Sequence, residues 1–150
     1  MWVSNGTAAG TSSIVVNRAD VSMELGSWSN DRSAVLLWLA DQDPQAWFYF
    51  AATDGTHGKE IWQSNGNTAY MRKDIRVGSS GSNPKHMAAM GSRVYFQAND
   101  GVHGAELWRA SPLGPASTTT VLVKDINIGS NGSNPMYLFE YGNKIYFQAD

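Results

Sequence analysis

Two clusters of carboxylates and histidine are the strongest candidates in this sequence for catalysis or metal binding. Each cluster spans seven residues and holds an aspartate, a histidine and a glutamate: Asp54, His57 and Glu60, then Asp100, His103 and Glu106. Side chains of these types bind metal ions and transfer protons in enzymes. These six residues are therefore the candidates for a binding site, in loops between strands.

The recurrence of the cluster favours an architectural role. A catalytic site is normally built once, whereas this cluster returns with the same internal spacing. Asp-Gly is a turn signal, in which the aspartate accepts backbone hydrogen bonds and the glycine takes a positive φ. We expect the histidine and the glutamate to brace that hairpin against Trp62 or Trp108. The sequence thus predicts no catalytic residue, no metal site and no cofactor.

Other polar motifs lead to the same interpretation. The loops at 78–84 and 129–135 resemble a phosphate cradle, but they lack a Lys-Ser/Thr ending and no helix follows, so we expect them to connect adjacent copies. The carboxylates of Asp41 and Asp43 lack the further ligands of a calcium loop and predict a solvated turn. The carboxylates of Asp74 and Asp125 are expected in strands, where hydrogen bonds to them would lock adjacent copies together.

These residues belong to a repeat that covers most of the chain. The string YFAATDGTHGKEIW begins at Tyr49, YFQANDGVHGAELW begins at Tyr95, and YFQAD begins at Tyr146. The first offset is 46 residues and the second is 51. The extra residues fall in SPLGPAS at 111–117, which has the composition of a lengthened surface loop.

The repeat predicts four short strands per copy, placed at 87–90, 93–98, 106–110 and 119–126 around the second copy. These segments are rich in aromatic and β-branched residues and are separated by Gly, Asn, Asp and Pro, and no window has helical periodicity. We predict an all-β chain of β-propeller-type blades, each of four antiparallel strands. The single array over 1–150 holds about three blade equivalents: 1–48 (degenerate), 49–94 and 95–145, with 146–150 starting the next.

Composition excludes several classes of protein. The 150 residues carry 11 Lys and Arg against 13 Asp and Glu, which is too few cations for a nucleic-acid surface. The absence of cysteine excludes disulfides, thiolate zinc sites and cysteine nucleophiles. No apolar run approaches the ~20 residues of a membrane helix. The residues after Met1 have no signal-peptide pattern.

Several of these strings together resemble the ELWxxDGT repeat family. They are Glu106-Leu107-Trp108, preceded by Asp100-Gly101 and His103-Gly104, and WVSNGTAAGT from Trp2. The resemblance implies a secreted or cell-surface bacterial repeat protein. The aspartate of the DGT element is replaced by asparagine at Asn5 and Asn65, which puts in doubt any role that needs that carboxylate in every blade.

Two functions remain open from the sequence. The first is a non-catalytic propeller segment that acts structurally or binds a protein or glycan partner, either as a piece of a longer propeller or as one half of a homodimeric ring. The second is part of a propeller enzyme, of glycoside hydrolase or lyase type, with its carboxylates elsewhere or in the irregular 17–46 region at Asp20, Glu24 and Asp31. We expect the recurring Trp2, Trp62 and Trp108 in the core. Outside that pattern lie Trp28, Trp38 and Trp47.

Overall fold

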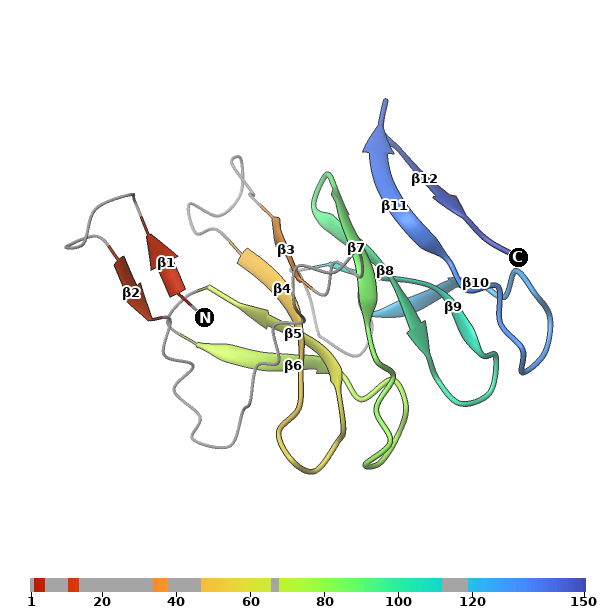
Figure 1. Ribbon diagram of the computed structural model, residues 1–150, viewed down its shortest axis with the longest axis horizontal. Helices are drawn as coiled ribbons and strands as arrows, with labels where there is room; N and C mark the ends of the chain where they lie inside the picture. The colour runs from red at the N-terminus through yellow and green to blue at the C-terminus, as the bar shows by residue number, and fades with distance from the viewer. Residues whose placement is uncertain (1, 5–10, 14–33, 38–46, 66–67, 112–118) are drawn as a thin grey trace.

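The protein is an all-β chain, as the sequence predicts. The computed structural model describes residues 2–4, 11–13, 34–37, 47–65, 68–111 and 119–150. All elements in these ranges are strands, and every pair of neighbouring strands runs antiparallel. The sheets follow one another along the long axis of the molecule (Figure 1).

Each sheet is a meander in which consecutive strands pair. The first four-stranded sheet contains β3 (Ala34–Leu37), β4 (Trp47–Ala52), β5 (Glu60–Ser64) and β6 (Ala69–Lys73). The second contains β7 (Lys85–Met90), β8 (Arg93–Asn99), β9 (Ala105–Ala110) and β10 (Val121–Lys124). Two-stranded sheets lie at the two ends of the row: β1 (Trp2–Ser4) with β2 (Thr11–Ser13), and β11 (Met136–Tyr141) with β12 (Lys144–Gln148).

The predicted strands at 87–90, 93–98 and 106–110 are confirmed to within two residues by β7, β8 and β9. The prediction of 119–126 was too long, because β10 covers only Val121–Lys124. Beyond that strand the backbone N–H of Ile126 donates to the side chain of Glu106 instead of a neighbouring strand. The strand therefore ends where a buried carboxylate takes over its hydrogen bonds.

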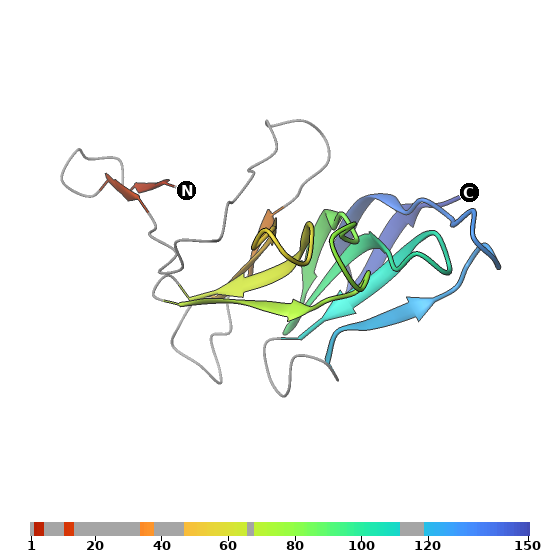
Figure 2. The same cartoon turned by 90° about the horizontal axis from the view of Figure 1, so that it is seen from below.

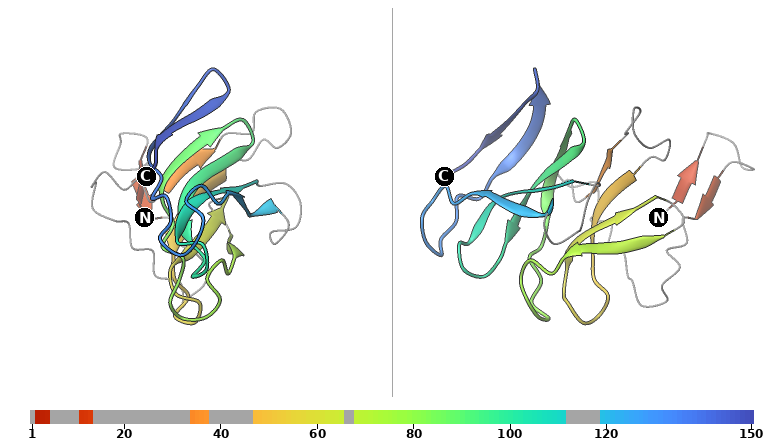
Figure 3. Two further views of the ribbon diagram at one scale, coloured as in Figure 1. Left: turned by 90° about the vertical axis from the view of Figure 1, so that its right-hand side faces the viewer. Right: turned by 180° about the vertical axis from the view of Figure 1, so that it is seen from behind.

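The second four-stranded sheet packs face to face against the first on one side and against the β11–β12 pair on the other (Figures 2 and 3). Their first strands, β3, β7 and β11, lie beside one another in succession. Tyr49, Ala51 and Ile61 of the first sheet share a buried cluster with Phe96 and Trp108 of the second. A matching cluster joins the second sheet to the β11–β12 pair. Burial of each large apolar side chain contributes roughly 1.5–3 kcal/mol, so the contact between sheets provides most of the core.

The recurring tryptophans are core residues where the structure describes their side chains. Trp108 packs between the first and second sheets. Trp62 is buried on the opposite face of the first sheet, with Phe50 and Ala52. The prediction is thus confirmed for these two residues, and the side chain of Trp2 lies outside the described residues.

Polar side chains also connect the first two sheets near their outer strands. The buried guanidinium of Arg72 donates to the carbonyl oxygen of Ser111 at 2.6 Å and to the Thr119 hydroxyl. Lys73 donates to the carbonyl oxygen of Thr120 at 3.2 Å and lies over the Trp108 ring, 5.5 Å from its centroid. These contacts fix both ends of the inserted loop, whose residues 112–118 are outside the described part of the chain.

The Gly-Ser-Asn-Pro loops join consecutive sheets, as predicted. In the first loop the Asn83 N–H donates to the Lys59 carbonyl oxygen at 3.0 Å, and the Ser82 carbonyl oxygen accepts from the Asn99 N–H at 3.0 Å. In the second loop the Asn134 N–H donates to the Ala105 carbonyl oxygen at 2.9 Å, and the Ser133 carbonyl oxygen accepts from the Asp150 N–H at 2.8 Å. Each loop is therefore bonded to the hairpin before it and to the end of the hairpin after it.

The described sheets form an open row and close no ring (Figure 3). In the ranges that the structure covers, no helix is long and apolar enough to cross a membrane.

Candidate functional site

The aspartate and histidine of each predicted cluster form a pair within one tight turn. Asp54 Oδ1 accepts hydrogen bonds from the backbone N–H groups of Thr56 and His57, both at 2.9 Å, and Asp54 Oδ2 lies 2.7 Å from His57 Nδ1. Asp100 and His103 repeat this arrangement, again with 2.7 Å between Oδ2 and Nδ1. This is the turn that Asp-Gly predicts.

The paired groups favour the ionised carboxylate and the protonated imidazole. Backbone hydrogen bonding from His57 lowers the pKa of Asp54 to about 2. The hydrogen bond to Asp54 in turn raises the pKa of His57 above its ordinary 6.5. For Asp100, partial burial opposes ionisation, but hydrogen bonds from His103 outweigh it and the pKa is lowered. Because both oxygens of each aspartate are used within its turn, the pair is a turn lock.

The glutamate of each cluster is separate from this pair. Glu60 is buried and accepts hydrogen bonds from the backbone N–H groups of Ser82 at 2.8 Å and Arg76 at 3.1 Å, and from the Ser82 hydroxyl. Burial raises the pKa of Glu60. The expectation that this glutamate braces the hairpin against Trp62 is wrong, because its partners are in the loop that leads to the next sheet.

Glu106 does the same in the second copy. It accepts from the Ser133 N–H at 2.8 Å, the Ser133 hydroxyl at 2.6 Å and the Asn127 N–H at 3.1 Å. A buried carboxylate is stable only when its oxygens accept such bonds. Glu60 and Glu106 are therefore the residues that hold each hairpin to the following inter-sheet loop.

The role assigned from the sequence to Asp74 and Asp125 is wrong. Both residues follow their strands, β6 and β10, and neither lies within a strand. Asp74 Oδ2 accepts only the nearby Gly78 N–H, at 3.4 Å. The buried glutamates at the start of β5 and β9, Glu60 and Glu106, form the hydrogen bonds that connect one sheet to the loop before the next.

The remaining predicted sites give no reactive cluster in the described residues. No group of three or more His, Asp or Glu side chains there is placed to hold a metal ion. The 78–84 and 129–135 loops use their backbone to bond neighbouring segments, as described above. The other acidic candidates, Asp20, Glu24, Asp31, Asp41 and Asp43, lie outside the described residues, as do Trp28 and Trp38.

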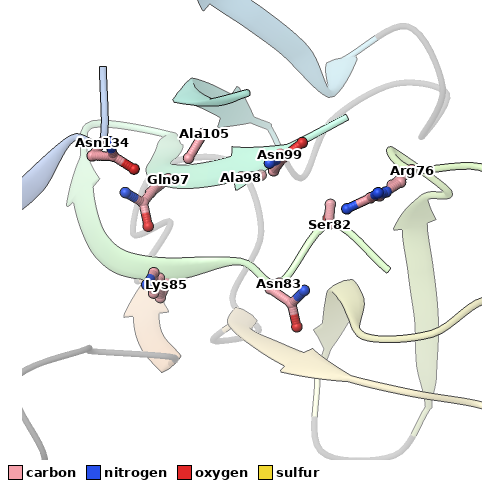
Figure 4. A pocket seen from close by; sticks show the side chains of 9 residues that line it. All are labelled: Arg76, Ser82, Asn83, Lys85, Gln97, Ala98, Asn99, Ala105 and Asn134. Carbon is pink, nitrogen blue, oxygen red and sulfur yellow. The ribbon is translucent and has the colours of Figure 1, made fainter. Parts of the chain in front are cut away.

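A hollow of about 190 Å³ lies between the two inter-sheet loops, at one end of β7, β8 and β9 (Figure 4). Two cationic residues and four carboxamides dominate its walls, and no carboxylate lines it. The complete lining is Arg76, Ser82, Asn83, Lys85, Gln97, Ala98, Asn99, Ala105 and Asn134. Sequence reasoning did not identify this site.

Gln97 is the most informative residue of this hollow. The residue is only 3% exposed, and its side chain lines the hollow (Figure 4). An amide offers both a donor and an acceptor. Gln97 can therefore bind a polar group that enters the hollow.

The repeat itself gives a signal for this site. At the equivalent positions of the next copy, 51 residues further on, Arg76 becomes Asn127, Lys85 becomes Met136 and Asn99 becomes Asp150. The framework of the hollow recurs, but its positive charge does not. Comparison of the two copies in the sequence places Arg76 and Lys85 among the positions at which a cation is lost.

Comparison with known proteins leaves the function to be argued from this geometry, since searches of protein-family models, curated proteins and solved structures found no match.

Proposed function

We propose that this chain is a non-catalytic array of propeller-type blades, which acts as a structural support or binds a protein or glycan partner. One observation carries the proposal. Both oxygens of each carboxylate in the two recurring clusters are engaged by groups of the protein itself, in both copies. A proton-transferring group must instead reach its substrate.

The arrangement of the sheets supports blades as the units of the array. Four-stranded meanders that stack face to face, with their first strands side by side, are the elements of a propeller. The resemblance of the repeated strings to the ELWxxDGT family supports a secreted or cell-surface location in a bacterium. About three blade equivalents fit into the chain on this proposal.

The outer face of β11–β12 supports further stacking. Tyr49 is fully buried against the second sheet, whereas Tyr146, its equivalent two copies later, is 43% exposed. Phe139 of β11 lies beside Tyr146 of β12, with ring centroids 5.5 Å apart, and Phe139 is 53% exposed. Exposed aromatic clusters of this kind mark contact surfaces. The partner on this proposal is another sheet of the same repeat, from a neighbouring blade or from a second chain that completes a ring.

Product analysis tests the non-catalytic assignment against the enzyme alternative. The full chain is incubated with a panel of neutral and acidic polysaccharides, and the products are measured by mass spectrometry. We expect intact glycans after prolonged incubation. The glycoside hydrolase or lyase alternative would be established if the wild type releases glycan fragments and the Asp20→Ala, Glu24→Ala or Asp31→Ala variant does not.

A further inference from the structure

We propose that the hollow between the two inter-sheet loops binds an acidic sugar, a uronic acid unit whose carboxylate is attracted by the cations Arg76 and Lys85. The inference rests on the binding form of the proposed function and names its ligand class.

Among the described residues, no acidic side chain lines the hollow to balance its positive charge. Neither Arg76 nor Lys85 forms an ion pair with a described residue, and none of the lining residues is acidic. Glu60 lies behind the Ser82 wall, where its oxygens accept the Ser82 hydroxyl and backbone N–H groups. Two unpaired cations on one hollow favour an anion, and a guanidinium matches a carboxylate with two parallel hydrogen bonds.

Arg76 is also held in place before any ligand arrives. A Cβ atom built on Gly101 would be 3.2 Å from Arg76 Nε and 3.6 Å from its Cγ, so the arginine side chain lies against the hairpin of the next sheet. Lys85 is on β7, directly opposite Gln97 in the ladder with β8. The cation and the buried amide therefore present neighbouring groups to one ligand.

Carboxamides provide the contacts that a sugar requires beyond its carboxylate. Gln97 brings an amide to the wall of the hollow, and Asn99 uses its Oδ1 for the Gly101 N–H at 2.7 Å, which leaves its NH₂ group as a donor. Asn83 and Asn134 reach the hollow from the two loops on either side. An amide offers both a donor and an acceptor, as a sugar hydroxyl does. A uronic acid unit carries a carboxylate for the cations and several hydroxyls for the amides on one ring.

The size of the hollow restricts the ligand to one small unit. Its volume of about 190 Å³ is below the ~300–1,000 Å³ of pockets for drug-sized ligands. A single sugar residue of a longer chain fits this range, while the rest of the chain stays in solvent.

The repeat provides variants that the fold already tolerates. Arg76→Asn and Lys85→Met introduce the residues of the next copy at these positions, Asn127 and Met136, and Gln97→Ala introduces the Ala51 of the preceding copy. A double variant Arg93→Asn/Lys144→Met, at two exposed positions outside the hollow, removes the same charge elsewhere. Thermal unfolding of each variant checks that it is folded.

Calorimetric titration with galacturonic acid oligomers tests the proposal, with galactose oligomers and a glutamate-rich peptide as comparison ligands. We expect the wild type to bind the acidic sugar, Arg76→Asn/Lys85→Met to bind at least about tenfold more weakly because charge-assisted bonds are lost, and Gln97→Ala to bind a few-fold more weakly. The Arg93→Asn/Lys144→Met control should bind like the wild type.

Four outcomes would overturn the inference. Galactose oligomers could bind equally well, the acidic peptide could be preferred, or the folded wild type could fail to bind the acidic sugar. The fourth is a loss of binding in the control as large as in Arg76→Asn/Lys85→Met. Those outcomes leave the non-catalytic array standing. Cleavage of the oligomers would refute the non-catalytic array, and the variant comparison would still decide whether the hollow holds the sugar.

Discussion

The Glu60 carboxylate is bonded to both the backbone N–H and the hydroxyl of Ser82, 22 residues further along the chain. Between these residues the chain completes β5 and β6 and turns toward the next sheet. The contact therefore fixes where one sheet ends relative to the start of the next. The contact between Glu60 and Ser82 thus helps to determine how consecutive sheets are placed.

Replacing this carboxylate by its amide should destabilise the protein strongly. In Glu60→Gln an NH₂ group replaces one of the two oxygens that accept from the Arg76 and Ser82 backbone N–H groups and the Ser82 hydroxyl, and the remaining bonds are no longer charge-assisted. We expect a loss of about 2–4 kcal/mol in the free energy of unfolding, measured in urea. Glu106→Gln should cost a similar amount, since its contacts are the same.

The exposed Glu140 offers the matched control. It accepts the Asn143 N–H at 2.9 Å, a bond that glutamine retains through its carbonyl oxygen. Glu140→Gln should change stability by less than about 0.5 kcal/mol. Equal effects of Glu60→Gln and Glu140→Gln would contradict the locking role.

Gly58 is predicted to tolerate no side chain. It has a φ of +68°, and a Cβ atom there would be 2.4 Å from the backbone nitrogen of Gly81. Gly55, with a φ of +83°, has open space around the same position. Gly55→Ala should therefore cost about 1–2 kcal/mol from backbone strain alone, and Gly58→Ala at least about 2 kcal/mol more. Thermal unfolding measures both, and indistinguishable melting temperatures would refute the close approach.

The sequence was sufficient for the strands, the tight turns and the burial of Trp62 and Trp108, because these depend on alternation, turn residues and recurrence. It was insufficient for the glutamates. In the sequence, Glu60 is close to Asp54 and His57, but its partners are 16 and 22 residues away. Proximity along the chain therefore suggested one cluster, whereas the fold has an aspartate–histidine pair in the turn and a separate glutamate bonded to the inter-sheet loop.

The hollow was missed for a similar reason. Asn134 comes from one inter-sheet loop and Arg76 from the stretch leading into the other, and only the stacking of sheets brings them to one place. Stacking distances do not follow from periodicity. The missing charges at Asn127 and Met136 were visible in the sequence, but repeats draw attention to what is retained.

Each turn histidine should titrate above its ordinary pKa of 6.5. NMR titration of the ring protons measures this directly. In Asp54→Asn the pKa of His57 should fall, because the carboxylate that stabilises the imidazolium is gone, while that of His103 should stay unchanged. A His57 pKa that is the same in both proteins would contradict the turn pair.

The same shifts define a window of stability. The His57 pKa is raised by folding, so its contribution is complete below about pH 6.5 and is lost as the pH rises through the folded-state pKa. The Asp54 pKa is lowered from 3.8 to about 2, so its contribution is present above about pH 4 and is lost toward pH 2. Urea unfolding of His57→Asn should therefore differ most from wild type near pH 5 and least near pH 9. A difference that is independent of pH would refute this coupling.

The exposed aromatic face should cause self-association. Phe139 and Tyr146 face each other across β11 and β12. We expect Phe139→Lys/Tyr146→Lys to lower the sedimentation coefficient at high protein concentration by removing apolar contact area. Val77→Lys, at a position that is 86% exposed in a loop, should leave it unchanged. A wild type that stays monomeric at all concentrations would count against the contact surface.

The inserted loop enters between β9 and β10, and it leaves the inter-sheet lock untouched. Glu60 reaches its serine across 22 positions, whereas Glu106 reaches Ser133 across 27, with the same donors. Repeat length is thus uncoupled from the stacking of the sheets at this outer edge. A segment can therefore be gained or lost there without any change to the contact that sets one sheet against the next.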